Sequence, residues 1–150
     1  MKTKLLAVVA AALLSIGAAA PAHAEPPLHS DIAYAIAAVP GGIVVDEHTV
    51  VWPELGMELR VAPMTARAVG TCATGQYCAY AQADRGGTKL SWTTCTTVST
   101  AALASVKSIA NARSSGKVQA RNSAGTVLAT ASAGASVNVF GPVSTLRCTP

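Results

Sequence analysis

Four cysteines constrain the fold of this 150-residue chain more than any other feature: Cys72, Cys78, Cys95 and Cys148. The spacing contains no C-x-x-C pair and no histidine follows His48, which makes a zinc site the weaker interpretation. If the chain is exported to an oxidising space, as the N-terminus discussed next predicts, four cysteines most simply form two disulfides. The five residues between Cys72 and Cys78 include a central glycine, which lets the chain reverse. We therefore favour this pairing among the three possible ones, which leaves Cys95 to pair with Cys148.

The first 24 residues have the pattern of a secretory signal peptide. Lys2 and Lys4 precede an uncharged apolar run over residues 5–20, and residues 22–24 form the small-x-small sequence that a signal peptidase cleaves. The run is shorter than the roughly 20 residues that a membrane-spanning helix needs. We expect a protein that is secreted to the extracellular space, begins at residue 25 and has no membrane partner.

Charge is distributed unevenly along the mature chain. Residues 25–59 contain six acidic residues and no Lys or Arg, whereas residues 60–150 contain nine basic residues and one acid, Asp84. Three interpretations stay open: docking of the acidic segment on the basic one, a basic surface for an anionic partner, or ordinary solvated faces. In the first case, the acidic segment could be a propiece that covers a binding face.

The acidic region, residues 25–68, is predicted to be a small α/β segment followed by a linker. Ser30 has the character of an N-cap before a short helix over residues 31–38, which the Pro-Gly-Gly sequence at residues 40–42 ends. β-Branched runs around a polar turn predict a hairpin. We expect its strands at residues 43–45 and 49–52, with a third strand at residues 57–61 and the linker at residues 63–69.

The cysteine-containing region, residues 69–150, is predicted to be an all-β domain because short strand candidates alternate with Gly- and Asn-containing turns. Helical periodicity is weak and confined to residues 99–103. A faint repeat with an offset of about 40 residues suggests two Greek-key units. The expected strands lie at residues 76–82, 89–93, 106–110, 117–121, 127–131, 136–140 and 143–148.

The same region lacks the groups that acid–base or nucleophilic catalysis requires. After residue 60 the sequence has no His, no Glu and one Asp, and its cysteines are expected to be oxidised. His29 and His48 are framed by no catalytic motif and are interpreted as structural or surface residues. We therefore expect no enzyme, no metal and no cofactor.

Nucleic acid is not the expected partner either. Binding to single strands needs exposed aromatic residues between basic ones, and binding to a duplex needs a helix or ribbon rich in Arg and Lys. The region has Tyr77, Tyr80, Trp92 and Phe140 among dispersed charges, and Tyr80 and Trp92 are more simply core or strand-pairing residues.

Three motifs occur in a fixed order in the cysteine-containing region: Cys72-x5-Cys78-x-Tyr80, Gly86-Gly87-x-x-Leu90-x-Trp92 and, after Cys95, Ser105-Val106-Lys107-Ser108-Ile109-Ala110-Asn111. In this order they resemble the secreted actinobacterial metalloproteinase inhibitors (SMPI-type), whose fold is βγ-crystallin-like. The resemblance covers about residues 69 to 150.

This resemblance implies a double Greek key that acts as a monomer and blocks an extracellular, thermolysin-like metalloprotease with a rigid, substrate-like loop. A braced loop loses little entropy on binding, and an inhibitor needs no catalytic residue of its own. The candidate inhibitory residues lie near the two cystines: Ala73, Thr74, Gly75, Gln76, Tyr77, Thr94, Thr96, Thr97 and Val98.

The sequence departs from that family in two respects, and two other functions stay open. The Cys95–Cys148 pair spans a long stretch, whereas the relatives close a second short loop. The stretch 103–108 has Lys107 and no acid where calcium-binding βγ-crystallins carry Asn or Asp, so we expect no calcium there. The alternatives are a non-inhibitory extracellular module that binds cell-wall polymers or an acidic protein, and a toxin-like βγ-crystallin relative.

Overall fold

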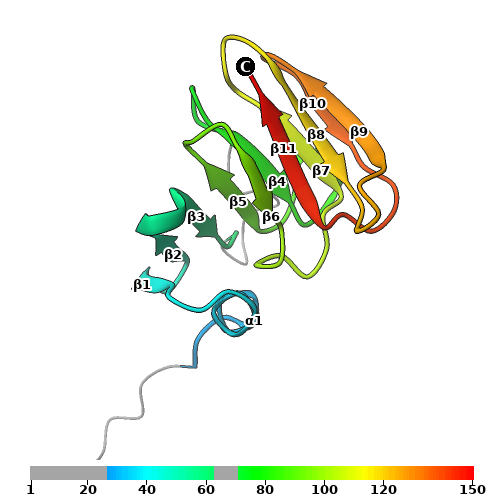
Figure 1. Ribbon diagram of the computed structural model, residues 1–150. Coiled ribbons are helices and arrows are strands. Elements are labelled where there is room, and N and C mark those ends of the chain that lie inside the picture. The colour runs from blue at the N-terminus through cyan, green and yellow to red at the C-terminus, as the bar shows by residue number, and fades with distance from the viewer. Residues whose placement is uncertain (1–26, 63–70) are drawn as a thin grey trace, which may run out of the picture.

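The computed structural model describes residues 27–62 and 71–150 (Figure 1). The predicted signal peptide, residues 1–24, and the predicted linker, residues 63–69, both lie outside these residues. The elements, in chain order, are α1 (Ser30–Ala38), β1 (Ile43–Asp46), β2 (Thr49–Trp52), η1 (Pro53–Leu55), β3 (Met57–Arg60), β4 (Tyr77–Tyr80), η2 (Ala83–Arg85), β5 (Lys89–Trp92), β6 (Thr97–Ser99), β7 (Ser108–Asn111), β8 (Lys117–Arg121), β9 (Val127–Ser132), β10 (Ser136–Asn138) and β11 (Thr145–Thr149).

The strands form two antiparallel sheets that pack face to face (Figure 1). The first has seven strands in the order β1-β2-β3-β5-β4-β7-β10, and the second has four in the order β6-β11-β8-β9. Each sheet contains one strand from the opposite half of the cysteine-containing region, because β10 joins the first sheet and β6 the second. The prediction of a mostly β fold is confirmed.

The acidic N-terminal segment continues the first sheet. β3 pairs with β5 over four residues, and this register places Leu59 opposite Leu90. Both side chains belong to one hydrophobic core that extends from Ile32 of α1 to Leu146 of β11. The helix is also joined to the rest of the molecule by a hydrogen bond from the Thr88 hydroxyl to the Asp31 carboxylate. The segment is therefore part of the sandwich in this structure.

The helix begins one residue earlier than the sequence suggested. Ser30 was predicted to be the N-cap, but Ser30 is the first helical residue and His29 is the cap, with its Nδ1 accepting a hydrogen bond of 3.2 Å from the Asp31 N–H. An imidazole nitrogen can replace the usual hydroxyl or carboxylate because only an acceptor is required. The helix ends before Pro40 as expected.

The strand predictions differ from the structure chiefly at β6. Weak helical periodicity over residues 99–103 was misleading, since Thr97–Ser99 is a strand and turns follow it. Thr97 and Val98 are β-branched and favour extended backbone, but three residues are too few for a periodic pattern. β10 also ends at Asn138, short of the predicted residue 140, and Phe140 is 85% exposed.

Candidate functional site

Both predicted disulfides are present in the structure. Cys72 pairs with Cys78 and Cys95 pairs with Cys148, with Cα atoms 5.8 and 5.1 Å apart. The candidate inhibitory residues accordingly fall into two groups. Residues 73–76, called the short loop here, are enclosed by the first disulfide, and residues 94–98, called the long-cystine segment, surround Cys95.

The short loop is a tight turn held from both sides. The Gln76 N–H donates to the Ala73 carbonyl at 3.0 Å, and Gly75 has a φ of +85°. A positive φ at the third position of such a turn is the conformation that glycine adopts without strain. The Gly75 N–H donates to the Ala112 carbonyl at 2.9 Å, and the Ala112 N–H donates to the Gln76 carbonyl at 2.9 Å. Its exposed tip is Ala73, Thr74 and Gly75.

The long-cystine segment is exposed but anchored at several points. Thr94, Thr96 and Thr97 are exposed, and Val98 is half-buried. Cys95 connects the segment to β11, and the Cys148 N–H donates to the Thr96 carbonyl at 3.0 Å. From Thr97 onward the segment is β6, paired with β11 in the second sheet. The segment therefore exposes its side chains to solvent while its backbone is held in place.

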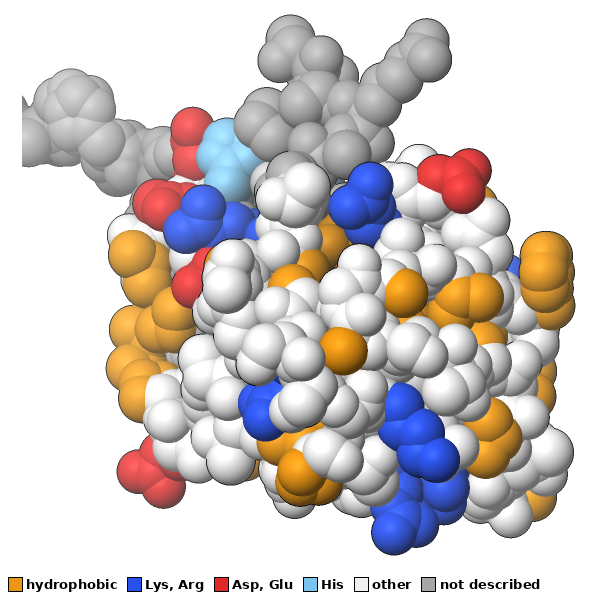
Figure 2. All heavy atoms as spheres, turned by 90° about the horizontal axis from the view of Figure 1, so that it is seen from above, with side chains coloured by type: hydrophobic (Ala, Val, Ile, Leu, Met, Phe, Trp, Pro, Cys, Tyr) orange, Lys and Arg blue, Asp and Glu red, His pale blue; other side chains and the backbone are white. Residues whose placement is uncertain are grey.

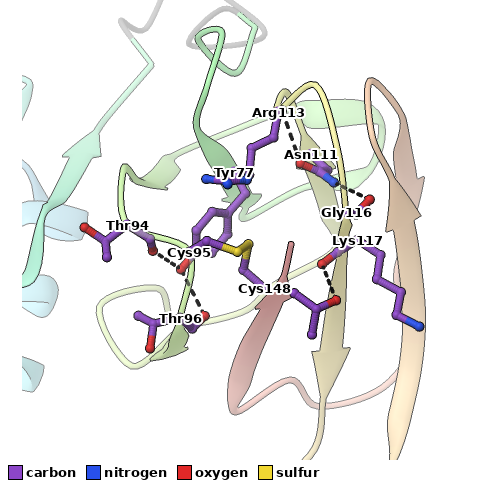
Figure 3. The surroundings of a disulfide bond; sticks show 10 residues. Tyr77, Thr94, Cys95, Thr96, Asn111, Arg113, Gly116, Lys117 and Cys148 are labelled. Atoms are coloured by element: carbon purple, nitrogen blue, oxygen red, sulfur yellow. Dashed lines mark hydrogen bonds between the residues drawn. A yellow bond between two sulfur atoms is a disulfide. The ribbon is translucent and has the colours of Figure 1, made fainter.

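Tyr77 connects the two groups (Figure 3). Its hydroxyl lies 3.1 Å from the Thr94 carbonyl oxygen and 3.3 Å from that of Thr96, so it donates to this pair of acceptors. The ring stacks on Trp92 with centroids 5.4 Å apart. Burial raises the pKa of this phenol. The hydroxyl is therefore a neutral donor at physiological pH.

The structure gives Tyr77 a different place from the other candidate residues. It is 0% exposed, so it positions the long-cystine segment from within the core. The sequence offered a signal for this, because Tyr77 lies within the strand expected at residues 76–82, and every residue of β4 is buried in the structure. Tyr80 and Trp92, expected in the core or in strand pairs, are buried on β4 and β5.

Asn111 ends the third sequence motif, and it holds the turn after β7, a role that the motif did not indicate. Its amide donates to the Gly116 carbonyl at 3.3 Å, and its Oδ1 accepts from the Arg113 N–H at 3.2 Å (Figure 3). The Asn111 side chain is 1% exposed. A buried amide that satisfies backbone groups on both sides fixes a turn strongly, because each group would otherwise lose its hydrogen bond. The signal is an asparagine at the end of an apolar strand candidate, since Asn111 is the last residue of β7.

A groove of about 560 Å³ runs beside the long-cystine segment. One wall is that segment, and the opposite wall is η1 with Glu54 and Leu55. Val39, Met57 and Trp92 also line the groove, and Glu54 is the single ionisable side chain among the residues that line it. Residues 73–76 do not line it, although Gln76 and Thr93 share a smaller depression of about 180 Å³ nearby.

Charge is separated across the surface. In Figure 2 most acidic side chains lie on the same side as a large hydrophobic area, and a compact group of Lys and Arg side chains lies apart from them. The second sheet also carries three basic residues on one face. Lys117, Arg121 and Arg147 lie on its outer face, because the residues that alternate with them, including Val118 and Leu146, are buried.

The histidines lie outside both groups of candidate residues. His29 caps α1, while His48 lies in the β1–β2 turn, 3.5 Å from the Glu47 carboxylate. The His48 N–H donates to the Asp46 carboxylate at 2.8 Å and lowers the pKa of Asp46. Over residues 27–62 and 71–150, no three His, Cys, Asp or Glu side chains lie close enough together to hold a metal ion.

Two further observations concern membrane helices and related proteins. Within the described ranges, no helix has the length and apolar character needed to cross a membrane. Comparison with family models, curated proteins and solved structures finds no match for the chain.

Proposed function

We propose that this protein is a secreted peptidase inhibitor that blocks a thermolysin-like metalloprotease with its long-cystine segment. The observation that carries the proposal is the bracing of residues 94–98. Three threonines are exposed there, while a disulfide, the Tyr77 hydroxyl and the Cys148 N–H hold the backbone. A segment that is already ordered loses little conformational entropy when a partner binds it.

A rigid backbone also makes the segment resistant to cleavage when it is bound in a protease cleft. Cleavage requires the bound peptide to distort toward the transition state and its ends to separate afterwards. Cys95 and its disulfide to Cys148 would keep both cleaved ends in place, because the strand β6 on one side and β5 on the other remain paired in their sheets. A bound segment that is cleaved slowly and released slowly is an inhibitor.

For the fold, the proposal is a βγ-crystallin-like double Greek key. The support is the order of strands, because the series β5-β4-β7 followed by β10 matches the series β9-β8-β11 followed by β6. Each half thus donates its third strand to the sheet of the other half. The faint sequence repeat has the same pairing of elements, with Leu90 on β5 and Leu128 on β9.

Secretion is part of the same proposal. Its support is the signal-peptide pattern of residues 1–24 together with two disulfides, which persist in oxidising compartments. Because inhibition requires no proton transfer by the inhibitor, the lack of His and Glu after residue 60 fits this role.

The test is a titration of a thermolysin-like protease with oxidised protein comprising residues 25–150. We expect activity to fall in proportion to added protein and to reach a minimum near one equivalent. Thr96→Arg should weaken inhibition at least tenfold, whereas Thr130→Arg, at an exposed position of β9, serves as the matched control and should leave it unchanged. Full activity of several metalloproteases at a large excess of the protein would overturn the proposal.

One observation favours a second function, binding to an anionic extracellular polymer. Arg147 of β11 pairs in register with Gln119 of β8, so it lies on the same face as Lys117 and Arg121 and diagonally opposite both. Such a contact is electrostatic and must weaken as salt rises. Retention on anionic cell-wall material that is lost in high salt and in the variant with all three residues changed to Gln would support it, and salt-independent retention would exclude it.

A further inference from the structure

The hydrogen bonds between β6 and β11 show which backbone groups of β6 are free. The Thr100 N–H donates to the Ser144 carbonyl at 3.1 Å, and the Cys148 N–H donates to the Thr96 carbonyl at 3.0 Å. Bonded and non-bonded pairs alternate in an antiparallel ladder. Val98, which lies opposite Leu146, therefore directs its N–H and C=O toward β11. Thr97 and Ser99 direct theirs away from it.

These outward groups lie at an open edge of the second sheet. β6 is the first strand in that sheet, and outside the strand ladders no backbone hydrogen bond among the described residues involves the N–H or C=O of Thr97 or Ser99. Four backbone groups in one row are a template for another extended chain. Edge strands in soluble proteins are usually protected by charged residues, proline or a bulge. β6 has the sequence Thr-Val-Ser and carries none of these residues.

The groove gives an added strand room and an apolar surface. It is lined by β6 on one side and by η1 on the other, and its volume of about 560 Å³ lies within the range typical of ligand sites. Leu55 on the η1 wall is 51% exposed, and Val98 on the β6 wall is half-buried. An apolar side chain between these two residues would cover both.

We propose that an extended segment of the target protease pairs with β6 in this groove and forms hydrogen bonds with Thr97 and Ser99. This inference rests on the proposed function and specifies how that site recognises its partner. The segment inserts an apolar side chain between Leu55 and Val98. It carries no acid there, because Glu54 is the single charge that lines the groove and would repel one. Backbone pairing supplies affinity, and the side-chain position supplies selectivity.

The N-terminal segment then has a direct part in binding. η1 forms the second wall, and the Thr93 N–H donates to the Gly56 carbonyl at 3.2 Å, which fixes this wall relative to the long-cystine segment. Gly56 adopts a φ of +54°, which turns the chain between η1 and β3. Removal of residues 25–60 would leave β6 with an open edge but without the groove.

Thr97→Pro tests the pairing because proline removes one outward N–H and places its ring on the open edge, while the bonds of Val98 to β11 remain. The matched control is Thr130→Pro on β9, the other edge strand of the same sheet. The Thr130 N–H also points away from β8. The Ala133 N–H donates to the Gly116 carbonyl, and because hydrogen-bonded and non-bonded pairs alternate along β9, the Thr130–Gln119 pair is a non-bonded one. Both variants are first compared with the wild type by their unfolding midpoints.

The measurement is the dissociation constant of each full-length mature protein for the protease, with inhibition measured in parallel. We expect Thr97→Pro to weaken binding at least tenfold and Thr130→Pro to change it less than twofold. Should Thr97→Pro fail to fold, Leu55→Glu provides the second variant, with Val127→Glu as its control, because both leucine and valine are exposed. Leu55→Glu should weaken binding at least fivefold by placing a second acid in the groove.

The outcomes separate this inference from the proposed function. Inhibition by the wild type with undiminished binding of Thr97→Pro and Leu55→Glu overturns strand pairing and leaves the inhibitor proposal intact. Binding that depends on Thr97 without inhibition supports strand pairing and overturns the inhibitor proposal. Absence of binding to every metalloprotease tested overturns both.

Discussion

The two disulfides of this protein constrain different parts of it. Cys72 and Cys78 are six residues apart in sequence, and they belong to a small cluster with Tyr80 and Ala110. Cys95 and Cys148 are 53 residues apart and pack in or against the main core. A disulfide that closes a longer loop removes more entropy from the unfolded chain. The short one thus shapes a turn, whereas the long one supports both the fold and the candidate binding segment.

The largest expected effect is the loss of the long disulfide. The double variant Cys95→Ser/Cys148→Ser should lose about 4 kcal/mol of unfolding free energy by the chain-entropy estimate. Inhibition should fall with it, because the backbone of residues 94–98 loses an anchor. Urea unfolding of the oxidised wild type and the variant provides the measurement. A loss below about 1 kcal/mol would show that the hydrogen bonds alone hold the segment.

Loss of the short disulfide should have about half that effect. In the double variant Cys72→Ser/Cys78→Ser, the short loop is no longer closed in the unfolded chain. The same estimate gives a loss of about 2 kcal/mol of unfolding free energy. Because residues 73–76 do not line the groove, inhibition should remain within a few-fold of the wild type at temperatures where the variant is folded. Complete loss of inhibition in a folded variant would indicate that the short loop, and not the long-cystine segment, binds the protease.

A smaller effect is expected for the connection between the two groups. Tyr77→Phe removes the hydroxyl that donates to the Thr94 and Thr96 carbonyls and should cost about 1 kcal/mol, the usual net value of one hydrogen bond. Tyr34→Phe, at an exposed tyrosine of α1, is the matched control and should leave stability unchanged. The variant should also release amide hydrogens of residues 94–96 faster in exchange experiments. Equal exchange rates would show that Tyr77 does not restrain this segment.

The smallest effect concerns alkaline pH. The pKa of Tyr77 is raised above its usual value of 10.0 mainly by burial, so the folded state favours the neutral phenol. Its contribution to stability is complete below pH 10 and decreases as pH rises through the folded-state pKa, because the unfolded chain ionises first. Tyr77→Phe should therefore lose less stability than the wild type over that range. The pKa of Tyr80 is also raised by burial, so both proteins still lose some unfolding free energy at alkaline pH.

The local parts of this structure could be predicted from the sequence, but their assembly could not. The bounds of β8 follow from the alternation of buried and outward residues between Lys117 and Arg121, and the disulfides follow from cysteine number and spacing. β6 was missed because its extended backbone depends on pairing with β11, which lies far away in the chain. Local patterns carry no information on such partners.

The candidate site shows the same division. Its exposed threonines were identified from their position beside Cys95, whereas the groove arises because η1 from the N-terminal segment lies opposite β6. That arrangement follows from the β3–β5 pairing, which no motif signals. Tyr77 was assigned to the exposed loop because it lies between Cys72 and Cys78 in sequence. Its side chain instead lies on the inner face of β4, where it stacks on Trp92.

Amide hydrogen exchange of the oxidised mature protein tests the central claim most directly. It is measured for the protein alone, with one equivalent of a thermolysin-like protease, and with one equivalent of the same protease whose active site is blocked. With the unblocked protease, the account predicts slower exchange at residues 94–99 and little change at residues 73–76. The blocked enzyme, whose cleft is filled, should give no such protection. Protection limited to the short loop or to the outer face of the second sheet, or no protection anywhere, would contradict the claim that the long-cystine segment binds a protease cleft.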